Sequence, residues 1–537
     1  MLAALSAQAA LLHTSSGQRL WVQTTQPGQS TGLSHAEGVI ATVPHYDGTA
    51  VLRIDDSDTA SSLHWREVLL PAGIRQEGES HLLWVTREVV DAALEAQEDA
   101  GAQGGSWEEH LKWSLAGTER TASQLLHSPH VAQHVFSPPA KSSIDIIAIF
   151  GSSSALLSVP PSRLSTLDLH LPRFTQAFLI TPETQLPTRT QGKDEPKFPT
   201  PSLLASTSKW LRSHHLSVAS LNKTATTLSG EDQSLISFEQ RWPSRHSATY
   251  GCRLASQWIL AQMREALGQV QGARCELEVY GEGNFSPNVV CVIPGQDEGV
   301  DEDADYQEGA ILLSAHYDSR GSFGNPRAPG GNDDGSGSTM LLAISRILGE
   351  KIAADQASLR SRAQGKLPSG LRRRELQLVF FSGEEQGLVG SKHYATALAA
   401  ALREGSKVYS PAASTLYRST TLRLALQTDM IGFQSPSEPV QLAFPDKLAT
   451  TSATHYIWAT AQLYVPELLV GFTPACCSDH QSFWEAGYPA TWVFERNGPI
   501  LDDKYHNSGD MVLREGYSVE KIGLVGKVVL ASALGLL

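Results

Sequence analysis

The sequence predicts an α/β fold in which a mixed, mostly parallel central sheet is flanked by helices, with a separate strand-rich N-terminal region. Beyond Ser234, short apolar runs typical of buried strands alternate with longer segments of helical spacing. Acidic and histidine side chains follow several of these runs, and the carboxyl ends of the strands are where open α/β sheets bind ligands. Before about residue 180, short apolar segments are instead separated by Gly, Pro, Ser and Asp, which favours strands and turns.

A chain of 537 residues exceeds the size at which a single core stops growing, so we expect at least two domains. We divide the chain into an N-terminal region, residues 1–235, and a main domain, residues 236–537. A stretch rich in Pro, Thr, Gln and Lys near residues 181–197 indicates a linker or an exposed loop.

Composition excludes some function classes. The chain has 42 basic and 56 acidic residues, a net charge of −14, which argues against nucleic-acid binding. We find no apolar run long enough for a membrane span. Residues 1–12 are a short apolar segment. The remnant of a secretory signal peptide and a segment of the mature protein explain it equally well. If the chain is exported, Asn222 and Asn284 are candidate glycosylation acceptors.

The five cysteines are too few for a disulfide framework, and at least one of them is left without a partner in the chain. For the adjacent Cys476 and Cys477, two thiols or other partners are favoured over a mutual bridge, because adjacent residues fit disulfide geometry poorly.

In the N-terminal region we predict strands over His81–Val85 and Ile144–Phe150 and one helix over Glu88–Gln97, and we identify no chemistry there. In the main domain, helical spacing extends from Ala255 to Leu267, and a C-terminal helix is expected within Ile522–Leu537. The principal strands and the helices between them are predicted at Ile311–Ala315, Ser338–Leu348, Leu376–Phe381, Leu388–Ala399, Leu422–Gln427, Thr451–Leu463 and Ala490–Phe494.

His316-Tyr-Asp318 follows the first of these strands. In an extended chain both side chains point the same way, so Asp318 is placed to orient or polarise the imidazole of His316. The tripeptide is weak evidence by itself, because His45-Tyr-Asp47 repeats it without comparable motifs after it. We interpret the first copy as structural and the second by its neighbours.

The next motif is Gly-Gly-Asn-Asp333-Asp-Gly-Ser-Gly. Its glycines allow the backbone to approach an ion closely, and Asp333 has two oxygens that can bridge two metals. An Asp-rich turn with a helix N-cap explains the same residues equally well.

Ser-Gly-Glu384-Glu385 follows the strand Leu376–Phe381. Adjacent carboxylates on a turn point in different directions, so one can bind a metal while the other takes a proton from water. The pair Glu108-Glu109 shows that such neighbours also occur without function, but the strand-end position favours a functional pair.

Three further strand-end or loop residues complete the candidates. Asp429 ends the segment Leu-Ala-Leu-Gln-Thr-Asp, where a cap is the ordinary role. His480 is either a ligand, a cap or part of the site wall, and His506 lies in a loop that can reach the same edge.

In their order these motifs resemble the di-zinc leucine aminopeptidase family of secreted fungal and bacterial metallopeptidases, over about residues 237–537. The resemblance implies a catalytic di-zinc peptidase domain that removes N-terminal residues from peptides through a di-zinc-activated water. It implies two Zn²⁺ per chain, with Glu384 as general base. In this assignment His316 and Asp429 hold one zinc, Glu385 and His506 hold the other, and Asp333 bridges them.

The resemblance further implies a cis peptide bond after Asp333, a secreted monomer and an N-terminal propeptide or accessory region at residues 1–235. The chain departs from the family at Cys476-Cys477, where many members have a cysteine-flanked loop with a tyrosine that can stabilise the oxyanion.

Three alternatives remain. One is a dipeptidase or carboxypeptidase activity within the same family, because loops determine specificity. A glutaminyl cyclase, an acyltransferase of similar fold that usually has one zinc, shares the His-Tyr-Asp and Gly-Glu-Glu patterns but lacks the Asp-Gly-Ser-Gly turn. A non-catalytic ectodomain of peptidase fold is disfavoured because this chain keeps every ligand candidate and Glu384.

Overall fold

A computed structural model describes most of the chain. The described residues are 19–25, 39–45, 48–55, 66–69, 80–101, 106–116, 143–180, 195–281, 284–295, 309–362, 373–405, 408–409 and 417–537. The apolar start at residues 1–12 lies outside them, as do most of the predicted linker and Tyr46-Asp47 of the repeated tripeptide.

The main domain is built on a six-stranded sheet of order β18-β15-β11-β12-β10-β9. The four strands β18, β15, β11 and β12 run parallel, and β10 and β9 continue the sheet antiparallel, so the predicted mixed, mostly parallel sheet is confirmed. The strands are β9 (Arg274–Glu278), β10 (Asn288–Ile293), β11 (Ala310–His316), β12 (Leu376–Phe381), β15 (Leu422–Thr428) and β18 (Ala490–Val493).

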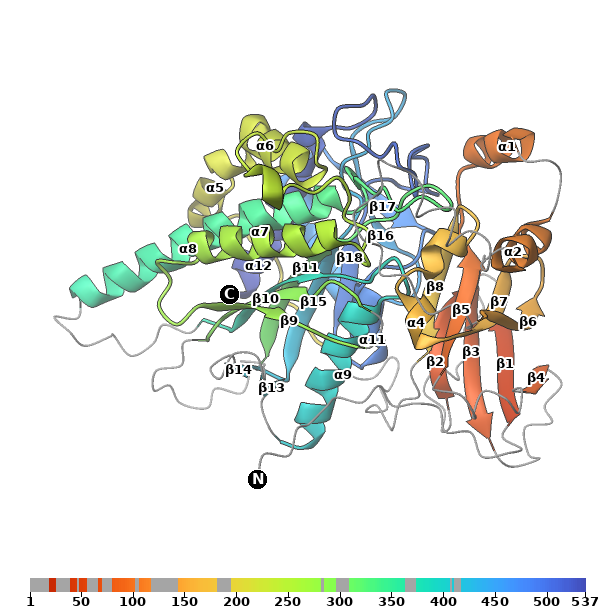
Figure 1. Ribbon diagram of the computed structural model, residues 1–537. Helices are drawn as coiled ribbons and strands as arrows, with labels where there is room; N and C mark the ends of the chain where they lie inside the picture. The colour runs from red at the N-terminus through yellow and green to blue at the C-terminus, as the bar shows by residue number, and fades with distance from the viewer. Residues whose placement is uncertain are drawn as a thin grey trace.

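Helices cover both faces of this sheet (Figure 1). One face packs against α7, α8, α10 and α12 in the largest hydrophobic core, and the other packs against α9 and α11. The middle strands are buried on both sides, which is why they read as continuous apolar runs. These helices span Tyr250–Ala266, Gly335–Arg362, Thr451–Tyr464, Val519–Leu536, Val389–Arg403 and His480–Glu485 in the order just named.

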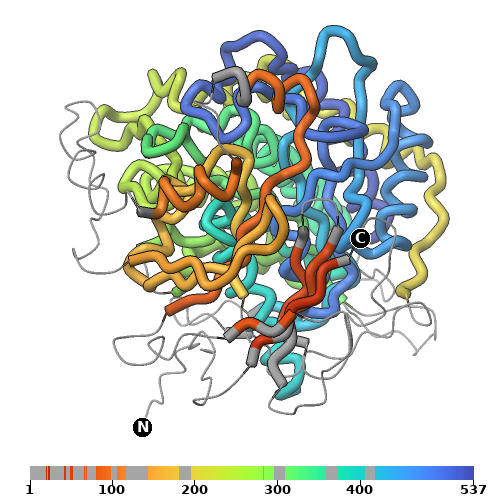
Figure 2. The backbone as a smooth tube through the Cα atoms, turned by 90° about the vertical axis from the view of Figure 1, so that its right-hand side faces the viewer, coloured from red at the N-terminus to blue at the C-terminus, as the bar shows by residue number. Residues whose placement is uncertain are grey.

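The N-terminal region contains two four-stranded sheets, which lie beside the main domain (Figures 1 and 2). The first has the order β2-β3-β1-β4 and the second the order β6-β7-β5-β8. Their strands are β1 (Arg19–Thr25), β2 (Val39–His45), β3 (Gly48–Asp55), β4 (Arg66–Leu69), β5 (His81–Arg87), β6 (Asp145–Phe150), β7 (Ser154–Val159) and β8 (Thr175–Ile180).

The predicted helix over Glu88–Gln97 begins later than expected. The structure has α1 at Ala92–Gly101, and β5 continues to Arg87, so Glu88 lies between the strand and the helix. The backbone N–H of Glu88 donates to Phe174 O at 2.8 Å. This hydrogen bond continues the antiparallel pairing of β5 with β8 by one residue beyond the strands. This pairing outweighs the helical propensity of the Glu-Val-Val-Asp segment.

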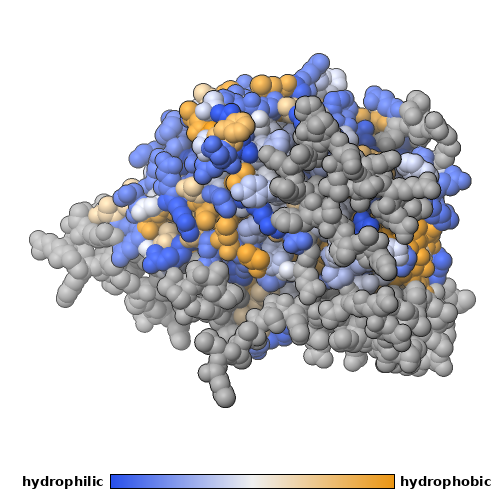
Figure 3. All heavy atoms as spheres, in the orientation of Figure 1, coloured by the Kyte–Doolittle hydropathy of each residue, from blue (hydrophilic) through white to orange (hydrophobic). Residues whose placement is uncertain are grey.

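The structure pairs Cys275 with Cys291 between the neighbouring strands β9 and β10, and leaves the buried Cys252 free. It also joins Cys476 to Cys477, the bridge that the sequence disfavours. None of the described helices is both long and apolar enough to cross a bilayer. The face shown in Figure 3 mixes hydrophilic and hydrophobic side chains.

Candidate metal centre

The predicted ligands meet at the carboxyl edge of the parallel strands. His316 ends β11, Asp429 directly follows β15, and Glu385 lies in the turn after β12. Asp333 lies in the turn that precedes α8, and His506 is in the long loop after β18. All five side chains are buried. The order of the sheet therefore gathers residues that are separated by up to 190 positions in the chain.

These side chains form two sets of possible metal donors. His316, Glu384 and Asp429 have donor atoms within 4.8 Å of one another, and Asp333, Glu385 and His506 form the second set by the same measure. The grouping places Glu384, the predicted base, beside the first pair of expected ligands.

Asp333 lies between the two sets. Its Oδ1 is 3.2 Å from His316 Nε2, and its Oδ2 is 3.6 Å from His506 Nε2. His316 Nε2 is also 3.4 Å from Asp429 Oδ1, and His506 Nε2 is 3.1 Å from Glu385 Oε2. The two oxygens of one carboxylate thus face two different histidines, which is the arrangement that a bridging ligand requires.

Several of these atoms lack a hydrogen bond. Among the described residues, His316 Nε2, Asp429 Oδ1 and Glu385 Oε1 are buried without a hydrogen-bond partner. Buried polar atoms are normally paired, so unpaired imidazole and carboxylate atoms within these two donor sets fit the ligands of a metal ion. Carboxylate and imidazole donors of this kind suit a divalent cation such as zinc.

The electrostatics of the site also favour a cation. Burial raises the pKa of Glu384 and Glu385 well above the usual range, and nearby carboxylates add to the effect. Burial likewise raises the pKa of Asp333 to about 6, although His316 opposes the shift. Burial lowers the pKa of His316, but the surrounding carboxylates, Asp429 foremost, together outweigh burial and the net shift is upward. Acidic groups crowded in this way are stabilised in their charged form by bound positive charge.

Asp318 lies behind His316, as the tripeptide predicts. Its Oδ1 is 3.6 Å from His316 Nδ1, and its backbone oxygen is 3.2 Å from the same nitrogen. On the other side, Asp334 accepts hydrogen bonds from the backbone N–H groups of His316 and Met430, and so ties two strand ends together. The peptide bond between Asp333 and Asp334 is cis, as the resemblance implies.

The side chain of Asp510 holds the backbone of the turn that carries Asp333. Its carboxylate accepts hydrogen bonds from the backbone N–H groups of both Asn332 and Asp333, at 3.0 and 2.9 Å. Asn332 in turn donates to Glu495. The sequence singles out neither acidic residue as a support, since both lie far along the chain from the turn that they hold.

His480 does not join either donor set. Its ring is buried and stacks on Trp492 with 5.8 Å between centroids. Burial lowers the pKa of His480 to about 3, so the ring is neutral. His480 is also absent from the pocket lining, and the N-cap of α11 is Asp479, so the geometry supports none of the three roles considered for His480.

A pocket opens onto the two donor sets, and two of its residues come from the N-terminal region. They are Glu88, directly after β5, and Gln176, in the neighbouring strand β8. The expectation that the N-terminal region carries no chemistry misses both. The remaining lining residues are Asp333, Glu384, Asp429, Met430, Ala475, Cys476, Cys477, Trp492, Phe494, Ile500, Tyr505 and His506.

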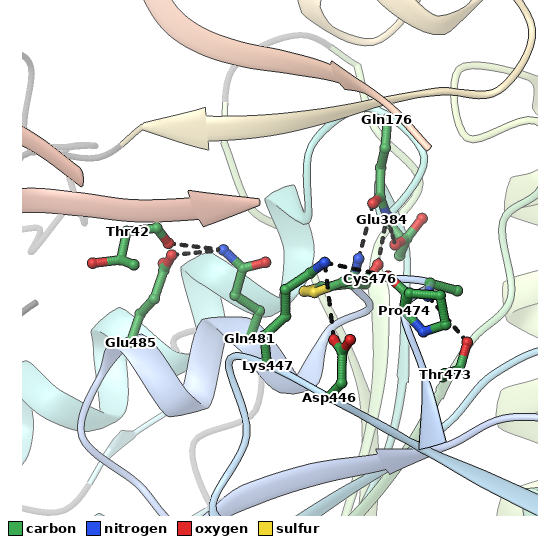
Figure 4. The surroundings of a disulfide bond; sticks show 12 residues. Thr42, Gln176, Glu384, Asp446, Lys447, Thr473, Pro474, Cys476, Gln481 and Glu485 are labelled. Carbon is green, nitrogen blue, oxygen red and sulfur yellow. Dashed lines mark hydrogen bonds and ion pairs between the residues drawn. A yellow bond between two sulfur atoms is a disulfide. The ribbon is translucent and has the colours of Figure 1, made fainter. Parts of the chain in front are cut away.

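Gln176 contacts the predicted base directly. Its Nε2 lies 3.4 Å from Glu384 Oε1 and donates to Cys477 O at 2.5 Å. Its Oε1 accepts from the N–H of Cys477 at 2.9 Å. Figure 4 shows the Gln176 side chain reaching between Glu384 and the segment of Cys476. A glutamine inside a buried strand gives no sequence signal, because only the packing of the two regions reveals its role.

Comparison with known proteins identifies the fold. Residues 288–532 match the model of Peptidase family M28. Leucine aminopeptidase 1 of Leptosphaeria maculans is 25% identical over 290 residues, covering 52% of this chain and 63% of that protein. Leucine aminopeptidase 1 of Grosmannia clavigera is 27% identical over 298 residues, covering 52% and 60%. The match therefore spans about three-fifths of the length of these curated relatives.

Among solved structures, the aminopeptidase LapA of Legionella pneumophila superposes with a TM-score of 0.54 at 15% identity. The superposition covers 86% of this chain and 99% of LapA, so it extends into residues before 288. At this identity the likeness concerns the fold alone. Residues 288–532 of this chain are therefore similar to Peptidase family M28, and the α/β fold is one that this chain shares with LapA.

Proposed function

We propose that this protein is a zinc-dependent aminopeptidase that removes N-terminal residues from peptides and holds two Zn²⁺ ions per chain. The observation that carries the proposal is the position of Asp333, whose two oxygens face His316 and His506 from one turn. The match to Peptidase family M28 and the leucine aminopeptidase relatives support the same activity.

The residues present suit two metal ions. His316 and Asp429 would hold one ion, Glu385 and His506 would hold the other, and Asp333 would be a ligand of both. Bound zinc would act as a Lewis acid that polarises the scissile carbonyl. It would also lower the pKa of water, so that a hydroxide nucleophile is available near neutral pH.

Glu384 is the general base in this proposal. Its carboxylate takes the proton of the attacking water and returns it to the nitrogen of the departing amine. Burial raises the pKa of Glu384, which suits a group that must both accept and release a proton. The side-chain amide of Gln176, 3.4 Å away, holds one oxygen of Glu384 and restricts the direction in which the base faces. Asp318 fixes the ring orientation of His316 from the opposite side.

The experiment is a kinetic screen of the full-length chain with aminoacyl anilides, with and without chelator. Zinc-dependent hydrolysis of a free leucine anilide, none of its N-acetylated form, and two zinc ions per chain are the expected results. One zinc ion per chain and cyclisation of N-terminal glutamine alone would contradict the proposal and favour a glutaminyl cyclase. Zinc binding without any turnover would favour a non-catalytic ectodomain.

Secretion and glycosylation belong to the same proposal, as does a monomeric state. Of the two acceptor sites, Asn284 is exposed in the loop before β10, whereas Asn222 is half-buried within the helix Val218–Leu228 (α6). Asn284 is therefore the site at which we expect glycan. A mass increase at Asn284 in protein from a eukaryotic host checks this.

A further inference from the structure

The N-terminal region contributes to the pocket a carboxylate that the proposed chemistry does not use. Glu88 lines the same pocket as Asp333, Asp429 and His506, but it belongs to neither donor set. We propose that Glu88 binds a primary ammonium group of the substrate's first residue, which gives the N-terminal region a part in substrate selection. This inference rests on the proposed aminopeptidase function.

The position of Glu88 is fixed, and one of its oxygens is available. Its backbone N–H is bonded to Phe174 O, and the hydroxyl of Tyr505 donates to its Oε1 at 2.5 Å. In the part of the chain that the structure describes, Oε2 has no hydrogen-bond partner. A carboxylate held at one oxygen and open at the other is prepared to accept a hydrogen bond from a ligand.

Glu88 forms no ion pair with any described residue, although the residue is only 5% exposed. The charge of Arg320 acts on Glu88, but the hydrogen bonds of its guanidinium go to the carbonyl oxygens of Leu171, Pro172 and Thr175 and to Nδ1 of His506. A buried carboxylate without a counter-ion is costly, so a cationic ligand would be bound strongly there.

Burial raises the pKa of Glu88 to about 8. The carboxylates of Asp333 and Asp429 add to this shift, and the hydroxyl of Tyr505 and the guanidinium of Arg320 oppose it. An ammonium group reverses this effect, because positive charge beside the carboxyl group favours its ionised form.

The remaining wall near Glu88 is apolar. Met430, Phe494 and Ile500 belong to one hydrophobic cluster that also contains Tyr505 and Val90, two residues beyond Glu88. Such a wall suits the methylene groups of a side chain, with the carboxylate receiving a charged end. Two ammonium groups fit this chemistry, namely the α-ammonium of any first residue and the side-chain ammonium of lysine.

The part of the N-terminal region around Glu88 and Gln176 is held to the main domain by buried polar contacts. Asp168 bonds to His246 at 3.0 Å, with both side chains fully buried, and the ammonium of Lys392 donates to Leu179 O in β8 at 2.6 Å. Glu88 and Gln176 line the pocket from this attached region, which therefore forms one wall of the site.

The test compares full-length Glu88→Gln with wild type on lysine and norleucine anilides, which differ in the terminal ammonium. If Glu88 binds the side chain, kcat/KM for the lysine anilide falls roughly 10- to 100-fold, the loss expected for one charge-assisted hydrogen bond. The norleucine value then stays unchanged. Glu108→Gln, on the exposed face of α2 (Trp107–Ala116), is the matched control and alters neither value.

If Glu88 binds the α-ammonium, both anilides lose activity by the same factor. Inhibition by leucine then weakens in Glu88→Gln, whereas inhibition by its 2-hydroxy analogue does not, which separates lost binding from a damaged fold. Unchanged kinetics and unchanged inhibition, at wild-type zinc content and melting temperature, would overturn the proposal, as would equal weakening of both inhibitors.

A failure of the proposed aminopeptidase function can be distinguished from a failure of the role proposed for Glu88. If the wild type hydrolyses no anilide, calorimetric binding of lysine, norleucine, leucine and the 2-hydroxy analogue to wild type and Glu88→Gln still decides whether Glu88 binds ammonium. Loss of affinity for an amine-bearing ligand alone supports the role of Glu88, and equal affinities in the two proteins refute it.

Discussion

The carboxylate of Asp510 holds the backbone of Asp333, with 2.9 Å between its Oδ2 and the Asp333 nitrogen. It also accepts from the N–H of Asn332 and contacts the guanidinium of Arg514 at 3.1 Å. The two oxygens of Asp333 face His316 of one donor set and His506 of the other, and its backbone is held by a side chain 177 positions further along the chain.

Replacing Asp510 with Asn should therefore weaken metal binding and leave the ligands themselves intact. We expect zinc affinity to fall about 10- to 100-fold, the usual effect of removing a group that orients a ligand. Activity should return at high zinc concentration. Zinc titration followed by activity checks this, and the exposed Asp503→Asn serves as control. Equal zinc affinities in the two variants would contradict the supporting role.

The sequence predicts the main domain well because its signals are local. The strand at Leu376–Phe381 is reproduced residue for residue, and the helix predicted at Thr451–Leu463 differs by one residue at its end. Buried strands between amphipathic helices leave strong periodic patterns, and several of the proposed ligands follow directly after such a pattern. The amino-acid sequence therefore already marks them as strand-end residues.

The contribution of the N-terminal region is not predictable in this way. Glu88 falls in a segment with helical propensity, and Gln176 is one polar residue in an apolar strand. Their function depends on how one domain packs on another, and this contact leaves no periodic trace in either segment. The support from Asp510 is hidden for the same reason, since it joins two distant loops.

Replacing Glu384 with Gln should separate catalysis from metal binding. The amide keeps the size of the side chain but cannot take a proton, so we expect kcat to fall about 10²- to 10⁴-fold with two zinc ions still bound. Glu385→Gln should instead lose one zinc ion, because its carboxylate lies 3.1 Å from His506 Nε2 in the second donor set. Metal analysis beside initial rates distinguishes the two variants. Full activity in Glu384→Gln would refute its role as base.

The buried pair of Asp168 and His246 should hold the N-terminal region in place. Burial raises the pKa of Asp168, but His246, with help from Arg320, outweighs it and the net shift is downward, so ionised Asp168 stabilises the fold. Asp168→Ala leaves His246 buried without its partner and should lower the free energy of unfolding by about 3–5 kcal/mol.

Urea denaturation measures this change. Glu108→Ala, which breaks the exposed pair with Lys112, should cost at most about 1 kcal/mol. If both variants lose the same small amount, the buried pair contributes no more than a surface contact.

Removing the metal should make stability fall as pH rises. Burial raises the folded-state pKa of Asp333 from 3.8 to about 6 and that of Glu88 from 4.5 to about 8. In the metal-free protein the folded state then binds more protons than the unfolded state, so the free energy of unfolding decreases between about pH 4 and pH 8. His316 acts in the same direction, because its raised pKa stabilises the fold only while the ring stays protonated. His506 opposes them at lower pH, because burial lowers its pKa, but the raised groups are more numerous. Bound zinc removes much of this dependence, since it favours the ionised carboxylates and the neutral imidazole. Melting temperatures of chelated and zinc-loaded protein at pH 5, 6, 7 and 8 should diverge as pH increases, and parallel curves would show that the buried acidic groups are not the metal site.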